Sequence, residues 1–367
     1  MRRFIRTLYC TLNMIAVLAL IGCLLTQYIN PNTFPYLEML GLVFPVIVVL
    51  NIIASICWLA AADHKRYFLA SMIPLMLSIP TLGKYFANND NTPMPKEKNE
   101  IKFFSYNVMA FNYLGWRENQ KVMQQIFDCI KKEDPDIICF QEFHNDTQEK
   151  FVMLDSIKQQ LNLSFIYYNQ TYTLGNHYFQ GNIIFSRYPI VSHGKINYEK
   201  SGNSTIWTDI VKDNDTMRVY NSHMESYRLS QENKQTINEL GKAQNVEAQK
   251  VENLVQKLIR AIQKRGTQTD ELADSIANSP YPVISCGDFN APPCSYVYNT
   301  TVKAGQLNDA FLEAGSGIGA TFNWWPQLRL DYILTSKQFE SKNFKRIGMK
   351  VSDHFPIMCT LQITEKQ

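Results

Sequence analysis

Polar residues of the same few types follow several apolar segments from residue 101 onward. In VISCGDFNAPP, Val283 to Pro293, an apolar segment leads directly into Asp288 and Asn290. A single aspartate or asparagine at a strand end more often caps a turn than it catalyses a reaction. Turns alone do not explain why six such segment ends carry only Asn, Asp, Glu and His. These residues are Asn107, Glu142, His223, Asp288 with Asn290, Asp331, and Asp353 with His354.

Carboxylates, amides and imidazoles without a thiolate indicate a particular chemistry. Oxygen ligands suit Mg²⁺ or Mn²⁺, which bind through one or two carboxylates and keep several waters. A histidine beside an aspartate provides a general base with an orienting carboxylate. Asparagine amides can hold a phosphoryl oxygen or a nucleophilic water without adding charge. Together these groups predict metal-assisted attack of water on a phosphate ester.

The segments that must position these residues alternate between strand-like and helix-like patterns. Helical periodicity predicts helices over Arg117–Lys132 and, as a long charged region, Ser230–Ser279. Many strands with few crossover helices predict an α/β fold with two mixed sheets packed face to face between helices. The polar residues fall at C-terminal strand ends, where α/β folds place their functional clefts. The predicted strands are 101–108, 135–142, 181–190, 204–211, 216–224, 281–289, 328–336 and 357–363.

The motifs FQE, NSHMES, GDFN, RLDYIL and SDH, in this order between residues 101 and 363, resemble the endonuclease/exonuclease/phosphatase superfamily. The resemblance implies a four-layered α/β sandwich and a Mg²⁺-dependent phosphoesterase, with Mn²⁺ as the other candidate ion. Glu142 of FQE matches the principal metal ligand. Asn107 of SYNV matches its neighbour in the metal and phosphate site, and Asp353 of SDH a further metal-site acid.

The same resemblance implies catalytic roles for the remaining matched residues. His223 of NSHM matches a position that contacts the phosphate. Asp288 and Asn290 of GDFN match the pair that positions the attacking water and stabilises the transition state. His354 of SDH matches the general base or a phosphate contact, with Asp331 of RLDY as its carboxylate partner.

Two features favour a lipid-type or inositol-phosphate substrate over DNA. Phe143 and His144 follow the QE pair, as in sphingomyelinase-like branches, whereas abasic-site DNA endonucleases carry a small polar residue and a lysine there. Residues 1–99 carry 8 Lys+Arg and 4 Asp+Glu of the chain's 36 and 33, so residues 100–367 keep 28 and 29, a formal charge of −1. A nucleic-acid binder usually has a basic excess. A nuclease and a catalytically silent phosphate-binding module remain the alternatives.

Three charge-poor runs indicate that residues 1–87 form a membrane region. They predict transmembrane helices over residues 8–29, 39–62 and 67–83, because about 20 apolar residues cross a bilayer. A cleaved signal peptide is the alternative for the first run, which follows basic residues. The polar stretch 88–100 then reads as a linker to a catalytic domain over 101–367.

The distribution of basic residues predicts which side of the membrane the catalytic domain occupies. Arg2, Arg3 and Arg6 precede the first run, and Lys65 and Arg66 precede the third, whereas residues 30–38 contain no Lys or Arg. The positive-inside rule places these basic segments in the cytoplasm and the catalytic domain on the periplasmic side. The N-terminal region resembles bacterial membrane-anchored members of the superfamily, which implies a multi-pass protein of the cytoplasmic (inner) membrane. The partners expected are a phosphate-ester substrate and the lipid bilayer.

Cysteine spacing and two further clusters leave simpler explanations open. The eight cysteines show no CxxC or zinc-type spacing, which predicts buried small apolar residues. Trp324 and Trp325 fit an interfacial wedge or a loop packed on the core. Arg260, Lys264 and Arg265 fit a phosphate clamp or, in preference, a solvated helix face.

Overall fold

The structure is a computed structural model that describes residues 2–364, except 61–66, 91–96, 98, 116–118, 149–151, 200, 243, 245 and 325–326. The chain forms two compact units, each assembled from three segments. Unit 1 contains Met1–Lys84, Ser226–Thr267 and Ala291–Thr300. Unit 2 contains Tyr85–Glu225, Gln268–Asn290 and Thr301–Gln367, and therefore all the candidate site residues.

Two six-stranded sheets, which we call sheet I and sheet II, form the centre of unit 2. Each has one parallel pair at its centre, β2–β3 or β8–β9, and antiparallel neighbours, so both sheets are mixed. Sheet I contains, in spatial order, β13 (Phe339–Arg346), β14 (Ile357–Ile363), β2 (Glu100–Asn107), β3 (Ile137–Asp146), β5 (Tyr178–Ser186) and β4 (Phe165–Leu174). Sheet II contains β10 (Asn308–Asp309), β12 (Asp331–Thr335), β9 (Val283–Asp288), β8 (Asp215–His223), β7 (Ser204–Lys212) and β6 (Ile190–Asn197).

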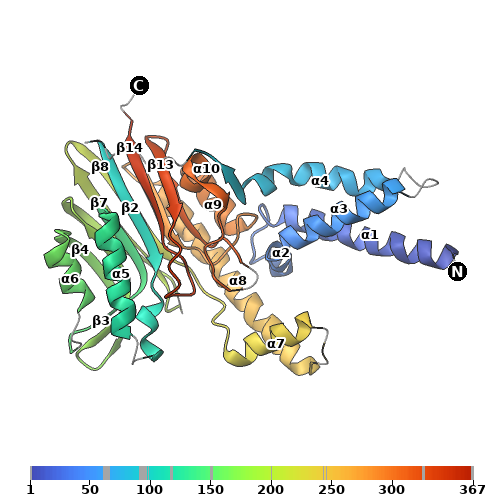
Figure 1. Cartoon of the computed structure of the whole chain (residues 1–367), viewed down its shortest axis with the longest axis horizontal. Coiled ribbons are helices and arrows are strands. Elements are labelled where there is room, and N and C mark those ends of the chain that lie inside the picture. The colour runs from blue at the N-terminus through green and yellow to red at the C-terminus, as the bar shows by residue number, and fades with distance from the viewer. Residues whose placement is uncertain are drawn as a thin grey trace. The chain divides into compact units, whose positions relative to one another are not determined.

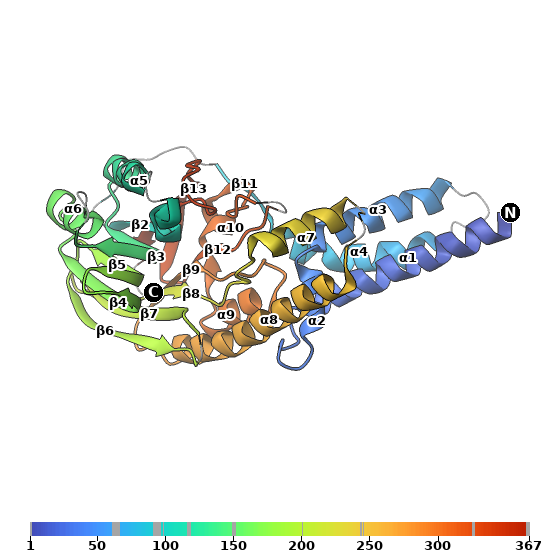
Figure 2. The same cartoon turned by 90° about the horizontal axis from the view of Figure 1, so that it is seen from below.

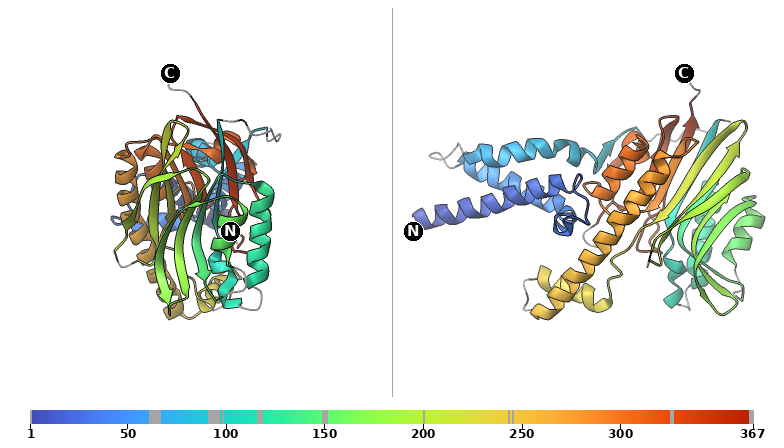
Figure 3. Two further views of the ribbon diagram at one scale, coloured as in Figure 1. Left: turned by 90° about the vertical axis from the view of Figure 1, so that its left-hand side faces the viewer. Right: turned by 180° about the vertical axis from the view of Figure 1, so that it is seen from behind.

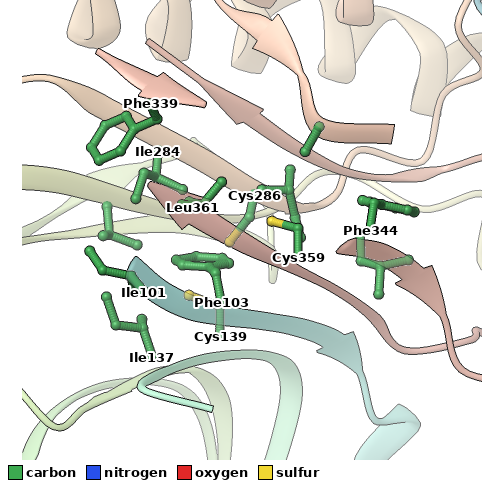
Figure 4. Close-up of a cluster of buried hydrophobic side chains, with 14 of the residues drawn as sticks. Ile101, Phe103, Ile137, Cys139, Ile284, Cys286, Phe339, Phe344, Cys359 and Leu361 are labelled. Carbon is green, nitrogen blue, oxygen red and sulfur yellow. The ribbon is translucent and has the colours of Figure 1, made fainter. Parts of the chain in front are cut away.

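An apolar layer joins the two sheets. Figure 4 shows Phe103 and Cys139 of sheet I beside Cys286 of sheet II, with Cys359 of β14 close by. All four side chains are fully buried. All eight cysteines are free, so the prediction that those within apolar strands act as small buried side chains is confirmed for Cys139 and Cys286.

Helices cover the outer faces of both sheets. On sheet I, α5 (Asn119–Glu133) and α6 (Met153–Gln160) pack apolar side chains such as Ile126 and Ile157 against Phe104 and Phe140 (Figure 2). The last turns of α8 (Ala248–Ala277) lie against sheet II, where Tyr220 of β8 donates a hydrogen bond to the Ser275 carbonyl at 2.8 Å (Figure 3). The predicted α/β fold of two mixed sheets between helices is therefore confirmed.

Several predicted elements have different bounds. The predicted strand 181–190 is two strands, because Arg187–Pro189 turns the chain from β5 in sheet I to β6 in sheet II. The predicted helical region 230–279 contains two helices, α7 and α8. Residues 91–96 and 98 of the predicted linker lie outside the described residues. The remaining elements are η2 (Met109–Gly115), α7 (Gln231–Gly241), α9 (Tyr296–Ala304), α10 (Ala310–Ala314), and β1 (Phe86–Asn88) paired with β11 (Ser316–Ile318).

The N-terminal helices of unit 1 differ from the prediction of three transmembrane spans. α1 (Arg2–Leu25), α3 (Phe44–Ala60) and α4 (Phe68–Gly83) lie side by side (Figure 1). Among the described residues only α1 is both long and apolar enough to cross a membrane, with a mean hydropathy of 2.3 over Arg6–Leu25. Together, α2 (Pro35–Gly41) and α3 would make one span, but they are bent by 70°, and α4 is only 16 residues long.

Proline positions explain this difference. Pro45 is the second residue of α3 and suits a helix start, so the apolar run 39–62 is interrupted rather than continuous. α4 ends at Gly83 and contains Pro74 and Pro80. The prediction of three transmembrane helices is therefore wrong: one helix qualifies, or two if the bent pair is one span.

Two segments from beyond residue 225 pack with these helices inside unit 1. Cys294 donates through Sγ to the Gly41 carbonyl at 3.2 Å, and Asn299 donates to the Gln27 carbonyl at 2.7 Å. In α8, Arg260 and Lys264 are exposed, as expected for a solvated face. Arg265 is only 1% exposed and its guanidinium lies 4.2 Å from the Tyr227 ring centre. The solvated-face interpretation is therefore wrong for Arg265.

We expect Gly287→Ala to destabilise unit 2 by at least about 3 kcal/mol. Gly287 has a φ of 122°, and a Cβ atom there would lie 2.0 Å from the backbone oxygen of Ser222 on β8. Thermal denaturation of the full chain measures the effect. Gly348→Ala is the control, because a Cβ atom at Gly348 meets no atom within 4 Å. Equal melting temperatures for the two variants would contradict the expectation.

Candidate active site

The predicted residues meet at one edge of the two facing sheets. Asn107 ends β2, His223 ends β8 and Asp288 ends β9, as the strand pattern predicted. Asp331 instead begins β12, which runs antiparallel to β9 and pairs Asp331 with Asp288. An antiparallel strand reaches this edge at its start. The prediction that Asp331 ends a strand was therefore wrong, but Asp331 does lie at the predicted edge.

Glu142 lies inside β3 rather than at its end, because β3 continues to Asp146. The pairing of β3 with β5 shifts between Phe140 and Phe143, and Glu142 has a φ of 53°. A β-bulge of this kind changes the direction of a side chain locally. It explains how a strand-interior glutamate belongs to the site. Asp353 and His354 precede β14, so the prediction of a strand end was wrong for these two residues as well.

The shortest contacts of the site join His354 to two aspartates. His354 Nδ1 lies 2.8 Å from Asp331 Oδ2, and His354 Nε2 lies 3.5 Å from Asp288 Oδ2. All three side chains are at least nine-tenths buried. Asp331 Oδ1 is also buried and has no hydrogen-bond partner among the described residues. The imidazole therefore bridges two carboxylates out of contact with bulk water.

Two asparagines connect these carboxylates to the rest of the site. Asn107 donates through Nδ2 to Asp288 Oδ2 at 3.0 Å, which links sheet I to sheet II. The Asn290 backbone NH donates to Asp288 Oδ1 at 2.9 Å, and its side chain donates to the Met224 carbonyl at 3.0 Å. Both oxygens of Asp288 are thus held by hydrogen bonds.

His223 and Glu142 form the more open side of the site. His223 Nε2 lies 3.5 Å from Glu142 Oε1 and 3.9 Å from Asp288 Oδ2. The Glu142 side chain is 30% exposed, whereas that of Asp288 is 1% exposed. Glu142 therefore gives the site its contact with solvent.

Burial, and then repulsion among the carboxylates, changes their protonation. Burial, followed by the charges of Asp353 and Asp288, raises the pKa of Glu142 to about 7. Burial and the charge of Asp331 likewise raise the pKa of Asp288. Burial opposes protonation of His354, but Asp331 and Asp288 outweigh it, so the pKa of His354 lies well above its usual range.

This excess of negative charge fits a divalent cation. One ligand atom each from Asp288, Asp331 and His354 lies within 4.8 Å of the others. His354 Nδ1 and Asp331 Oδ2 already bond each other. Glu142 is more exposed, and the repulsion that raises its pKa would be relieved by a cation. The donor set, oxygen with imidazole and no thiolate, suits Mg²⁺ or Mn²⁺.

Seven of the eight predicted residues are joined by contacts with one another in the structure. The eighth, Asp353, lies close enough to Glu142 for its charge to raise the pKa of Glu142. Sequence reasoning assigned no role to Ser352 or Thr321. Ser352 Oγ donates to the Asn107 carbonyl at 2.9 Å and accepts from the His354 NH at 3.2 Å. Thr321 Oγ1 accepts from the Asp331 NH at 3.1 Å. Ser352 opens the SDH motif, whereas Thr321 has no sequence signal.

The two residues that follow the QE pair, Phe143 and His144, are core side chains. Phe143 is fully buried and packs edge-on against Phe111 at 5.5 Å, so it belongs to the core under α5. His144 is buried as well, 4.5 Å from the Tyr178 ring centre. Of the tryptophan pair, Trp325 lies outside the described residues.

Comparison with known families identifies this arrangement. Residues 104–354 match the Endonuclease/Exonuclease/phosphatase family, which is more than half of the chain. The chain belongs to this family. Its members are hydrolases that act on phosphoester bonds, and they typically depend on a divalent metal ion. Residues 3–85 match a second family, described as Domain of unknown function (DUF8431). No curated protein sequence matches the chain.

Solved structures share the fold at low sequence identity. The endonuclease/exonuclease/phosphatase from Beutenbergia cavernae is 13% identical, with a TM-score of 0.51 over 73% of this chain and 72% of that one. The human Nocturnin catalytic domain with bound sulfate is 19% identical, with a TM-score of 0.51 over 74% and 97%. D. rerio TDP2 with a single-strand DNA product is 16% identical, with a TM-score of 0.50 over 72% and 99%.

We expect Glu142→Gln to stabilise the metal-free protein at pH 8 but not at pH 4. Between pH 4.5 and about 7 the folded state keeps a proton on Glu142 that the unfolded state releases, so stability falls as pH rises through this window. Glutamine does not titrate, so Glu142→Gln removes this loss of stability. The free energy of unfolding should therefore rise by up to about 3 kcal/mol above pH 7. Thermal denaturation in EDTA at both pH values measures it. Glu340→Gln, at an exposed position of β13, is the control. A variant less stable than wild type at pH 8 would refute the argument.

Proposed function

We propose that this chain is a membrane-attached, Mg²⁺-dependent phosphoesterase. The observation that carries the proposal is the cluster of Asp331, His354 and Asp288, joined by contacts of 2.8 and 3.5 Å and bordered by the more exposed Glu142. Glu142, Asn107 and Asp353 are the residues that we assign to the metal ion. When bound, the ion would polarise the phosphoryl group and offset its negative charge.

The protonation of His354 suggests how the remaining roles divide. The raised pKa of His354 keeps its imidazole protonated at neutral pH, so we assign to it hydrogen-bond donation to a phosphoryl oxygen. Asp331 holds that imidazole through Nδ1. Asp288 and Asn290 are then the groups that orient the attacking water, with Asp288 accepting its proton. His223, beside Glu142, is a second donor to the phosphate.

The substrate that we favour is a phospholipid head group or an inositol phosphate. The formal charge of −1 for residues 100–367 supports it, since a polyanionic nucleic acid would be attracted by a basic surface. The apolar helix α1 supports it too, because attachment to a bilayer would bring the enzyme near lipid. Phe143 and His144 after the QE pair, as in sphingomyelinase-like branches, favour the same class by likeness of sequence.

A nuclease is the second candidate. The fold is similar to that of D. rerio TDP2, which was crystallised with a single-strand DNA product, although 16% identity supports only the likeness of fold. Activity screens on phospholipid vesicles, soluble inositol phosphates, nucleotides and supercoiled plasmid would separate the candidates. Plasmid nicking that weakens steeply with salt would favour the nuclease.

We expect the full chain in detergent micelles to hydrolyse bis-p-nitrophenyl phosphate with Mg²⁺ and to lose this activity in EDTA. Glu142→Ala should lower the rate by more than the 10- to 100-fold typical for outer-shell partners of a metal. Glu340→Gln, at an exposed position, should leave the rate unchanged. Equal rates for wild type and Glu142→Ala would contradict the proposed phosphoesterase activity of this site.

We further propose that unit 2 lies on the periplasmic side of a bacterial inner membrane. Arg2, Arg3 and Arg6 favour a cytoplasmic N-terminus, and a single crossing by α1 then leads outside. A reporter enzyme that is active only in the periplasm, fused after Asn99, should therefore be active. A silent fusion would indicate an even number of crossings or the opposite orientation.

A further inference from the structure

The bulge that carries Glu142 is a point where strand pairing is interrupted. Phe140 pairs with Ile183, and the next pair joins Phe143 to Gly181, so Gln141 and Glu142 lie opposite the single residue Asn182. A bulge leaves an extra residue unpaired and weakens the local ladder. The direction of Glu142 therefore depends on contacts from outside the β3–β5 ladder.

Asn221 of β8 provides such contacts from the opposite sheet. Its Nδ2 atom donates to the Phe140 carbonyl at 2.9 Å and to the Ile183 carbonyl at 2.9 Å. These two residues are the last regular pair before the bulge, one on each strand. Asn221 is fully buried, so both bonds form away from bulk water. A single amide thus ties sheet II to both strands of sheet I directly beside the bulge.

Gln141, the residue before Glu142, completes this connection. Its Nε2 atom donates to Asn221 Oδ1 at 2.7 Å and to Ser105 Oγ of β2 at 3.3 Å. Its backbone carbonyl accepts from the Val108 NH at 3.1 Å, immediately after Asn107. Gln141 is also fully buried. Gln141, the first residue of the bulge, is therefore hydrogen-bonded to Asn221 of β8, to Ser105 of β2 and to Val108 just after β2.

Asn221 also has a direct relation to the catalytic edge through its own strand. His223 lies two residues further along β8, and residues two apart on a strand point to the same face. His223 Nε2 lies 3.5 Å from Glu142 Oε1, across the same gap that Asn221 spans. One strand therefore carries both a side chain of the site and the amide that ties it to the strand bearing Glu142.

We propose that Asn221 is a positioning residue for Glu142, with Gln141 as its partner. The Asn221 amide sets the position of β8 relative to the bulge, and thereby the position of the Glu142 carboxylate relative to His223 and Asp288. This inference rests on the proposed function, because it assigns Glu142 to the metal ion. Outer-shell partners of metal sites typically change metal affinity by about 10- to 100-fold when removed, and we expect Asn221 to fall in this range.

The test compares Mn²⁺ binding, measured by electron paramagnetic resonance, for full-length proteins in detergent micelles. Asn221→Leu keeps a similar side-chain volume but removes both donors, and should weaken Mn²⁺ binding by about 10-fold or more. Tyr220→Phe is the matched control. It removes the hydrogen bond that the hydroxyl of Tyr220, the residue before Asn221, donates to the Ser275 carbonyl of α8. It should lower thermal stability without changing Mn²⁺ affinity. Glu142→Ala identifies the binding that belongs to this site.

A second variant keeps the test decisive if Asn221→Leu does not fold. Gln141→Met removes the amide that bonds Asn221 Oδ1 and should weaken Mn²⁺ binding less, but in the same direction. Unchanged Mn²⁺ affinity in the folded variants would overturn the positioning role while leaving the proposed function intact. Absence of site-specific Mn²⁺ binding in the wild type would overturn both. If Tyr220→Phe weakened Mn²⁺ binding as much as Asn221→Leu, the loss of binding would reflect general destabilisation. That result would also overturn the positioning role of Asn221.

Discussion

Face-to-face packing of two mixed sheets is the constraint on which the site depends. Asn107 and Glu142 belong to one sheet and His223, Asp288 and Asp331 to the other, so their distances are set by the layer between the sheets. That layer contains small side chains, such as Cys139 and Cys286, beside larger ones. Because such interiors are close-packed, the spacing of the sheets is fixed to a fraction of an ångström. The hydrogen bond from Asn107 to Asp288 joins the two sheets and therefore depends on that spacing.

The same packing creates the electrostatic state of the site. Removing Asp288 and Asp331 from water beside Glu142 and Asp353 is unfavourable unless a positive charge accompanies them. His354 supplies such a charge within the buried group, and the attraction of Asp331 and Asp288 for that charge is what raises the pKa of His354. Glu142, at the more exposed side, keeps a raised pKa of about 7. A folded scaffold that holds repelling acids in place is preorganised for a cation and a phosphoryl group.

Much of this could be predicted from the sequence. Apolar runs followed by Asn, Asp or His located β2, β8 and β9 closely, because strands buried on both faces give continuous apolar segments. Among the strands that were missed, β4 and β13 are edge strands with exposed or mixed residues, which carry no such signal. The membrane region was overpredicted, since composition alone does not register the 70° bend after α2. Thr321 was missed because its role depends on a backbone contact with Asp331.

The sequence by itself determined the chemistry: the identities and order of the eight polar residues define a family of phosphoester hydrolases without reference to coordinates. The tertiary structure decided what those residues do to one another. Which carboxylates share His354, which asparagine bonds Asp288 and which side chain faces solvent all depend on contacts between strands far apart in the chain. The bulge at Glu142 belongs to this second group, because an irregular register arises from pairing with β5 and from the Asn221 amide, and neither has a local pattern. Local residue patterns record side-chain types, whereas protonation and direction follow from distances that only the packed fold sets.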